Sequence, residues 1–444
     1  MRKMITRKKS KINKNSLLFK FTLLTIFLTI ILGNSSTFNL GNIFKGIPVK
    51  VTEVLMIINL VLICRNFILR KKKVYFGVEK ILLIWCIFGV ISTFINIFFY
   101  KYKLNEVLYG LLYSVRYFIY IIYTILVSEF LFNSNINIYR FYMFIIKSYL
   151  VVSILGIIQI IIWPNSIDYY SFLSKFNIYL LNPDPHINRI ISTYLDPNYL
   201  SAILIIPINL TLILILKEKK KLKFLISFLL LVATLIGTVS RSGLIGLAIS
   251  LGITLTFSMI GVNTKKEIVF NKIILLLFII LIIIIPMVIY FNLDSSRVLQ
   301  RIIGFRDDPS AIARFLSWQE SFSIIKENKI IGIGYNMLGF YTGNLKTMTS
   351  FGVDASLLLI AITTGVIGLI LYLFYYIKKL YILIRYMKKD KYIFSSLIGI
   401  IIASIVMSMF NNLLFYPLWI IPFFIVINFS VRDINNKYKT NKYL

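Results

Sequence analysis

The sequence predicts an all-α, polytopic membrane helix bundle of about 12 transmembrane helices. Three observations lead to this fold class. The chain of 444 residues is 58% hydrophobic and has a mean hydropathy of +0.84, which is too apolar for a soluble protein of this length. Apolar runs of about 20 residues, the length a helix needs to cross a bilayer, recur throughout. Backbone groups in lipid must be hydrogen-bonded within their own segment, which favours helices.

The candidate spans follow the apolar runs in chain order: 17–33, 48–64, 81–99, 107–131, 142–163, 198–216, 223–238, 243–260, 273–291, 354–376, 392–410 and 413–430. The first run is not followed by a small-residue cleavage site, so we expect it to remain as a span rather than to be removed as a signal peptide. An even number of spans places both termini on the same side of the membrane.

The formal net charge of +32 would indicate nucleic-acid binding in a soluble protein, but here the basic residues sort by loop. The N-terminal segment, the short basic loops such as KEKKKLK and IKKLYILIRYMKKDK, and the C-terminal tail all fall on one side of the predicted topology. The positive-inside rule makes that side cytoplasmic. We therefore predict two cytoplasmic termini and no nucleic-acid partner.

We expect residues 1–444 to form a single integral membrane domain with two long extracytoplasmic loops, 164–197 and 292–353. Loops of this length are usually functional or disordered, and their Pro, Gly and aromatic content favours folded loops. The second loop contains Asp308–Pro309, a typical helix start. The helix that follows is expected to have one apolar face. That face either packs on the bundle or lies at the outer membrane interface beside a lipid substrate. That face consists of Ala311, Phe315, Trp318, Phe322 and Ile325, with Glu320 and Glu327 opposite.

Arginines near the outer side are the main candidates for binding chemistry. Arg116 lies well inside the fourth span, where a charge is costly and is a functional candidate by default. The alternative is a structural ion pair, but the fourth span offers no obvious acidic partner. Arg189 ends the first long loop, and Arg241 lies at the junction of spans seven and eight. Arg297 and Arg301 are four residues apart, so they share a face on a helix.

Arginine pairs bidentately with phosphate and keeps its charge at every working pH. Several outer arginines without metal ligands therefore predict a metal-free diphosphate site, and surface ion pairs are the alternative. The single histidine, His186, has a weaker case as an acid–base group. Cys64 and Cys86 predict neither a metal site nor a disulfide. We find no Walker A motif, so the sequence gives no sign of an ATP-driven pump, and we expect no cofactor.

Asp354 stands alone in the run FGVDASLLLIAITTGVIGLIL, where an apolar helix should begin. An acid at that position is a favourable helix cap, because it interacts with the free amides and the helix dipole. It is also a candidate working carboxylate. Both roles are compatible. Gly365 and Gly368, deeper in the same predicted span, are expected to be helix-packing positions.

Four segments occur in an order that resembles the O-antigen ligase and polysaccharide polymerase superfamily of bacterial integral membrane proteins. They are STYLDPNYLSAIL, TVSRSGLIGLAISL, ARFLSWQESFSIIKENKIIGIGYNML and VDASLLLIAITTGVIGLILYL. The resemblance covers about residues 110–380 and implies a glycosyltransferase of the bacterial cytoplasmic membrane. Such enzymes transfer a glycan from undecaprenyl diphosphate to an acceptor hydroxyl on the outer face, without a metal or cofactor.

The resemblance implies that Arg189 and Arg241 hold the diphosphate, and that Arg116 and Arg314 match further basic positions of the family. Arg297 and Arg301 lie in the variable part of the loop. Ligases typically carry a histidine where this chain has Asp354, which favours a repeat-unit polymerase for capsule or exopolysaccharide, with Asp354 as the catalytic residue. The expected partners are lipid-linked donor and acceptor, membrane lipid, a chain-length regulator and a separate flippase.

Two alternatives remain open at this point. One is an O-antigen ligase or protein O-glycosyltransferase that uses the same donor with another acceptor. The other is a transporter, such as a flippase of lipid-linked oligosaccharides. Twelve spans fit a transporter, but no inverted repeat is visible in the sequence, and flippases generally lack a folded outer loop of this size.

Overall fold

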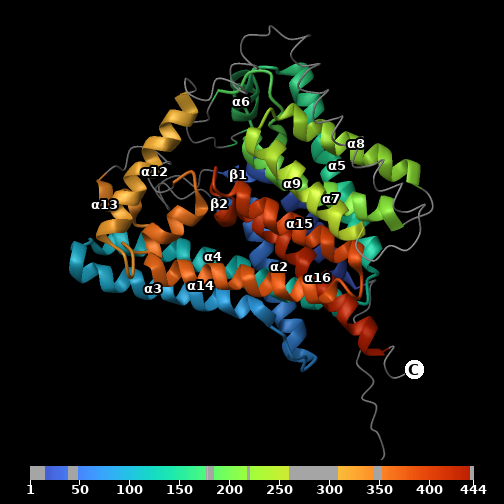
Figure 1. Ribbon diagram of the computed structural model, residues 1–444, viewed down its shortest axis with the longest axis horizontal. Helices are drawn as coiled ribbons and strands as arrows, with labels where there is room; N and C mark the ends of the chain where they lie inside the picture. The colour runs from blue at the N-terminus through green and yellow to red at the C-terminus, as the bar shows by residue number, and fades with distance from the viewer. Residues whose placement is uncertain are drawn as a thin grey trace, which may run out of the picture.

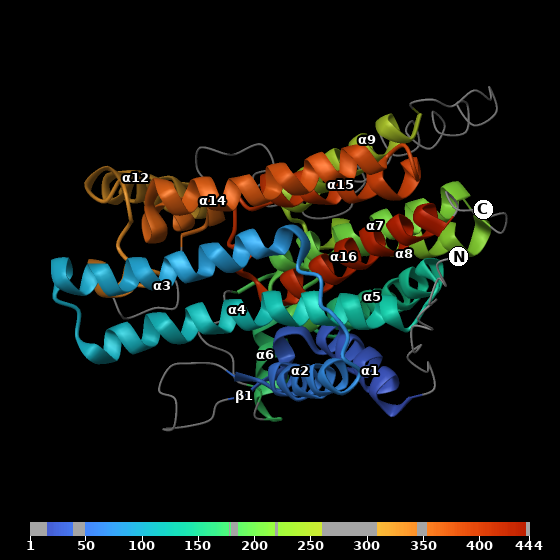
Figure 2. The same cartoon turned by 90° about the horizontal axis from the view of Figure 1, so that it is seen from below.

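The computed structural model describes residues 16–38, 49–176, 178, 185–217, 221–259, 309–343 and 353–440. It confirms the all-α membrane bundle. Within these ranges, nine helices are long and apolar enough to cross a membrane, and two further apolar helices are shorter. The long helices run roughly side by side along one axis (Figures 1 and 2).

Each predicted span that lies within the described residues coincides with a helix. These helices are α1 (Leu17–Leu32), α2 (Val51–Leu69), α3 (Lys80–Tyr100), α4 (Leu104–Asn133), α5 (Ile138–Ile162), α7 (Pro197–Lys217), α8 (Lys221–Gly237), α9 (Arg241–Met259), α14 (Ser356–Tyr386), α15 (Lys391–Met407) and α16 (Pro417–Thr440). The span predicted at 273–291 lies outside the described residues.

The short elements and the 19-residue helix α12 gather at one end of the bundle, which we call the Tyr416 end. They comprise the 3-10 helices η1 (Gly33–Ser36), η4 (Ser192–Tyr194) and η6 (Leu413–Phe415), the strands β1 (Thr37–Phe38) and β2 (Val49–Lys50), and the helices α6 (Ser166–Ser174), α12 (Pro309–Glu327) and α13 (Leu338–Thr342). The two strands pair antiparallel, with Thr37 opposite Lys50. The 3-10 helix η3 (Gly77–Glu79) precedes α3 at the other end.

α14 is broken at Gly365, which has a φ of 63° and divides the helix into two segments. The backbone groups freed by the break pair with the segment after α12. Val366 donates its N–H to the carbonyl of Lys329 at 2.8 Å, and Ile333 donates to the carbonyl of Ile362 at 2.9 Å. The sequence predicts a simple helix-packing position at Gly365, and this prediction is wrong. Gly365 is the point at which two chain segments interlock.

Side chains of α3 complete this interlock. The Ser92 hydroxyl donates to the carbonyl of Ile331 at 2.6 Å, and the Asn96 amide donates to the carbonyl of Gly332 at 2.9 Å. Exposed carbonyls are costly at membrane depth unless the protein supplies partners. The IIGIG segment thus lies against α3 and α14, and its glycines allow the backbones to approach.

Replacement of Gly365 by alanine is expected to lower the free energy of unfolding by about 2–3 kcal/mol, because the residue's conformation is close to glycine-only. A Cβ there would also lie 2.2 Å from the Ile330 carbonyl oxygen. Thermal denaturation in detergent micelles measures the effect. Gly252→Ala is the matched control, since a Cβ at Gly252 meets nothing within 4 Å. We expect it to be neutral or to stabilise by up to about 1 kcal/mol. Equal melting temperatures of Gly365→Ala and the wild type would contradict the predicted loss of stability.

An aromatic cluster joins α3, α4 and α14 in the core. The fully buried Trp85 makes edge contacts with Tyr117 and Tyr372, with ring centroids 5.5 and 5.0 Å apart, and packs at 6.0 Å from Phe415 of η6. Pairs of this kind each add about 0.5–1.5 kcal/mol beyond the area that they bury. The cluster fixes the helices that carry the residues discussed below.

Ion pairs tie the helices together at the end away from Tyr416. Lys379 of α14 pairs with Glu79 and also donates to Asn428 of α16 at 2.5 Å. Arg432 of α16 pairs with Glu129 of α4. These charges are nearly fully buried, so removal of one partner would leave the other uncompensated.

α12 begins at Pro309, as the sequence predicts, and its predicted apolar face is packed only in part. Phe315 and Phe322 are 67% and 54% exposed, whereas Ser321 and Ile324 are 2% and 6% exposed. Trp318 and Ile325 of the predicted face pack against the cluster that contains Ile324, whereas its two phenylalanines point outward. In a membrane protein an apolar stripe does not require a protein partner, so apolar periodicity does not identify the packed face.

Candidate functional site

The two sequence segments that carry Arg189 and Arg241 meet at the Tyr416 end. The Arg189 guanidinium donates from Nε to the carbonyl of Thr238 at 2.8 Å and from Nη2 to Oδ1 of Asn198 at 3.4 Å. The same Asn198 oxygen accepts from the Ser240 hydroxyl at 3.0 Å. Arg241 follows directly as the first residue of α9. These bonds join Arg189, Asn198 and Ser240 into one network, which we call the Arg189 network, and Arg241 is the residue next to Ser240 in the chain.

Local sequence explains how this network forms. Asp196 precedes Pro197 and caps α7, because its Oδ1 accepts from the N–H groups of Asn198 at 2.7 Å and Tyr199 at 2.9 Å. A cap of this kind stabilises a helix by about 1 kcal/mol. Ile190 donates its N–H to the carbonyl of Gly237 at 2.8 Å, which joins the end of the first long loop to the turn between α8 and α9.

Asp354 and Arg314 form a second pair of predicted residues. Arg314 Nε lies 3.4 Å from Asp354 Oδ2, an ion-pair distance without a hydrogen bond at that nitrogen. The N-cap position of α14 is held by Ala355, so Asp354 lies one residue outside the position that the cap interpretation requires. Its side chain is 54% exposed. The chain places this carboxylate beside a guanidinium, at the surface of the second loop.

Two stacked tyrosines connect these groups. The rings of Tyr199 and Tyr416 stack with centroids 4.2 Å apart. The carboxylates of Asp196 and Asp354 both act electrostatically on Tyr199, which lies in the first turn of α7 next to Asn198 of the Arg189 network. Burial raises the pKa of Tyr416 well above its usual value, so its phenol stays neutral. Sequence reasoning missed both tyrosines, and neither carries a signal that separates it from the many other tyrosines of the chain.

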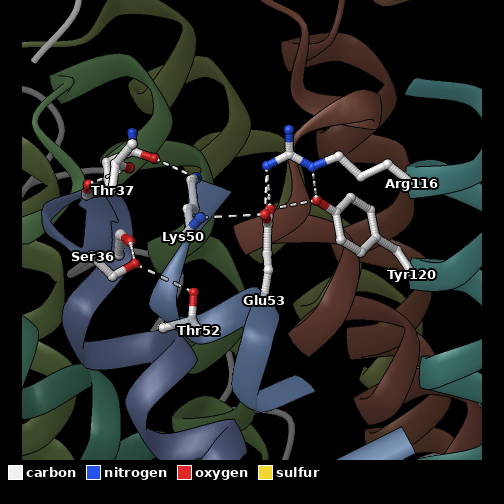
Figure 3. A network of polar contacts seen from close by, with 9 residues as sticks. Ser36, Thr37, Lys50, Thr52, Glu53, Arg116 and Tyr120 are labelled. Carbon is white, nitrogen blue, oxygen red and sulfur yellow. Dashed lines mark hydrogen bonds and ion pairs between the residues drawn. The ribbon is translucent and has the colours of Figure 1, made fainter. Parts of the chain in front are cut away.

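Arg116 lies in a third cluster, which Figure 3 shows. Its Nη2 contacts both carboxylate oxygens of Glu53 at 2.5 and 2.6 Å, and its Nε donates to the Tyr120 hydroxyl at 2.6 Å. The Tyr120 hydroxyl in turn donates to Glu53 at 2.5 Å. The acidic partner that the fourth span lacks is thus supplied by α2. The available signal was Glu53 itself, an isolated acid inside the predicted span 48–64.

The remaining candidates are placed as follows. Arg297 and Arg301 lie outside the described residues. His186 is 9% exposed. Its N–H donates to the Ser166 hydroxyl oxygen at 2.7 Å, and the Ser166 N–H, at the start of α6, donates to the His186 carbonyl at 2.9 Å. Across the described ranges, no group of three or more His, Cys, Asp or Glu side chains is arranged to hold a metal ion.

The fold and these clusters define a multi-pass helical membrane protein with arginine networks at one end of its bundle. Residues 226–373 match the family model of the O-antigen ligase, which confirms the resemblance to the O-antigen ligase and polymerase superfamily. The matched segment contains Arg241, Arg314 and Asp354, whereas Arg116 and Arg189 precede it. No curated protein is significantly similar to the chain.

Proposed function

We propose that the protein is a polysaccharide repeat-unit polymerase. It transfers a glycan from undecaprenyl diphosphate to the acceptor hydroxyl of another lipid-linked repeat unit, at the outer face of the bacterial cytoplasmic membrane. The observation that carries the proposal is the ion pair of Arg314 with Asp354, whose charge acts on Tyr199 in the first turn of α7, next to Asn198 of the Arg189 network. A carboxylate and several guanidinium groups thereby lie at one end of the bundle.

In this proposal Arg189 and Arg241 bind the diphosphate and neutralise the charge that grows as it leaves. Asp354 accepts the proton of the acceptor hydroxyl, whose oxygen forms a bond to the anomeric carbon. The bond from that carbon to the diphosphate oxygen breaks, and undecaprenyl diphosphate departs with the bonding electrons. Attack from the side opposite the leaving group inverts the anomeric centre. Arg314 orients the Asp354 carboxylate between turnovers.

The identity of residue 354 supports a polymerase over a ligase. In ligases of this superfamily a histidine is the usual candidate at the matching position, whereas this chain has an aspartate. A reconstituted assay with lipid-linked repeat units tests the choice. We expect a ladder of products that differ by one repeat unit. A single transfer to a different acceptor would instead assign a ligase or protein O-glycosyltransferase, and movement of the lipid-linked unit without transfer would assign a flippase.

Asp354→Asn is expected to lower the rate of polymer formation by about 100-fold or more, because the amide cannot accept the proton. The melting temperature should stay close to that of the wild type, since the side chain is half exposed and lies outside the N-cap position of α14. The rate is measured from ladder formation in proteoliposomes at matched protein level. A normal ladder from this variant would remove Asp354 from the mechanism.

A further inference from the structure

Lys50 is a buried cation that the proposed mechanism does not use. It lies at the N-cap position of α2, and strand pairing with Thr37 holds its backbone in place (Figure 3). The residue is 8% exposed. Its ammonium donates to Oδ1 of Asn34 at 2.6 Å and lies 5.4 Å from the centroid of the Tyr416 ring. Within the described ranges, Asn34 is the one hydrogen-bond acceptor of this ammonium.

Among the residues that the structure describes, the charges around Lys50 do not balance. Glu53 comes from its own helix and Arg116 faces it from α4, so two cations share one carboxylate, and that carboxylate is already engaged by Arg116 and Tyr120. Residues 39–48, which join β1 to β2, contain a lysine and no acid. The N-terminus of α2 adds further positive potential. A buried and uncompensated cation is costly, which is unusual unless an anion binds there.

Burial and the neighbouring charges also disfavour the charged form of Lys50 on balance. Burial lowers its pKa to about 8; Arg116 also lowers the pKa, and Glu53 opposes both effects. The other titratable group that faces the ammonium is Tyr416, whose pKa burial raises. Lys50 is therefore largely charged at neutral pH and loses its charge in the range in which arginines keep theirs.

Contacts connect Lys50 to the proposed site. Its partner Asn34 donates to the carbonyl of Tyr194, which lies two residues before Asp196, the cap of α7. Its ring neighbour Tyr416 stacks on Tyr199, the tyrosine on which Asp354 acts. η1 and β2 thus bring a cation from the first two helices, outside the matched segment 226–373, to the end of the bundle that holds the arginines.

We propose that Lys50 is a further phosphate-binding residue of the lipid diphosphate site, with Arg116 and Glu53 as the pair that holds it in place. The inference rests on the proposed function. The ammonium donates to a diphosphate oxygen, which supplies the negative charge that the protein lacks at this point. Arg116, already engaged by Glu53, is a positioning residue rather than a direct ligand.

The test measures equilibrium binding of undecaprenyl diphosphate to the full-length protein in phosphatidylcholine nanodiscs, at about pH 7 and about pH 9.5. We expect Lys50→Gln to weaken binding about tenfold at the lower pH, the effect of one charge-assisted hydrogen bond. Wild-type binding should weaken on going to the higher pH, as the ammonium loses its proton. Lys50→Arg should show a smaller pH dependence, because guanidinium stays charged. Lys175→Gln, at an exposed position after α6, should match the wild type at both values.

Thermal melting of the ligand-free protein separates binding from folding. Removal of an uncompensated buried charge should leave the melting temperature of Lys50→Gln equal to or above that of the wild type, since glutamine can still bond to Asn34. A lower melting temperature together with unchanged binding would show a structural role and overturn the inference. Two further binding measurements use nanodiscs that contain phosphatidylglycerol and solutions of inorganic pyrophosphate. Lys50-dependent binding of either one in place of undecaprenyl diphosphate would also overturn it.

The same assay separates the inference from the proposed function on which it rests. Loss of binding in Arg241→Ala with normal binding in Lys50→Gln would overturn the role of Lys50 alone. Normal binding in both variants would overturn the diphosphate site itself.

Discussion

Arg241→Ala is expected to lower polymer formation by about 100-fold or more, which is the usual cost of losing one charged contact to a leaving group in the transition state. Arg241 opens α9 directly after Ser240, which belongs to the Arg189 network. Lysine at this position keeps a point charge but cannot bind two phosphate oxygens at once. We therefore expect Arg241→Lys to retain an intermediate rate. Ladder formation from lipid-linked repeat units in proteoliposomes measures both variants.

Arg385→Ala is the matched control for this substitution. Arg385 is exposed in the last turn of α14. Its removal changes the net charge by the same amount as Arg241→Ala, and it should leave the rate unchanged. Full-length polymer from Arg241→Ala at wild-type protein level would exclude this arginine from the diphosphate site. It would also remove the proposed role of the segment TVSRSGLIGLAISL in binding the donor.

Glu53→Ala is expected to cause the largest loss of stability among the substitutions discussed for this protein, about 3–5 kcal/mol. The carboxylate binds Arg116 through both oxygens and accepts from Tyr120, and Lys50 lies beside it. Its removal leaves two buried cations without a counter-charge. The melting temperature in detergent micelles should fall by on the order of 10 °C.

A double variant and a control sharpen the interpretation. Replacement of Arg116 by leucine in the Glu53→Ala background removes one of the two uncompensated cations, so part of the lost stability should return. Glu320→Ala, at an exposed position of α12, should stay within about 0.5 kcal/mol of the wild type. If Glu53→Ala had the melting temperature of the wild type, the ion pair with Arg116 would contribute nothing to the stability of the fold.

Much of the bundle could be predicted from local sequence. A run of apolar residues as long as a bilayer is thick has few alternatives to a membrane-spanning helix, so positions such as those of α5 and α7 follow from composition alone. The start of α12 at Pro309 follows in the same way from cap chemistry. The packed face of α12 followed only in part, because lipid accepts exposed apolar side chains that a soluble protein would have to cover.

The sequence by itself determined the fold class, the positions of the described spans and the residue types at the candidate site, since each depends on neighbours along the chain. Only the tertiary structure decided which charges meet. Glu53 reaches Arg116 from another helix, Arg314 reaches Asp354 across the second loop, and the strand that carries Lys50 brings its charge close to Glu53 and Arg116. The break at Gly365 also depends on the segment Lys329 to Gly334, which lies 31 to 36 residues earlier in the chain. These partners are distant in sequence, and a charge alone does not specify which opposite charge the packing of helices will bring to it.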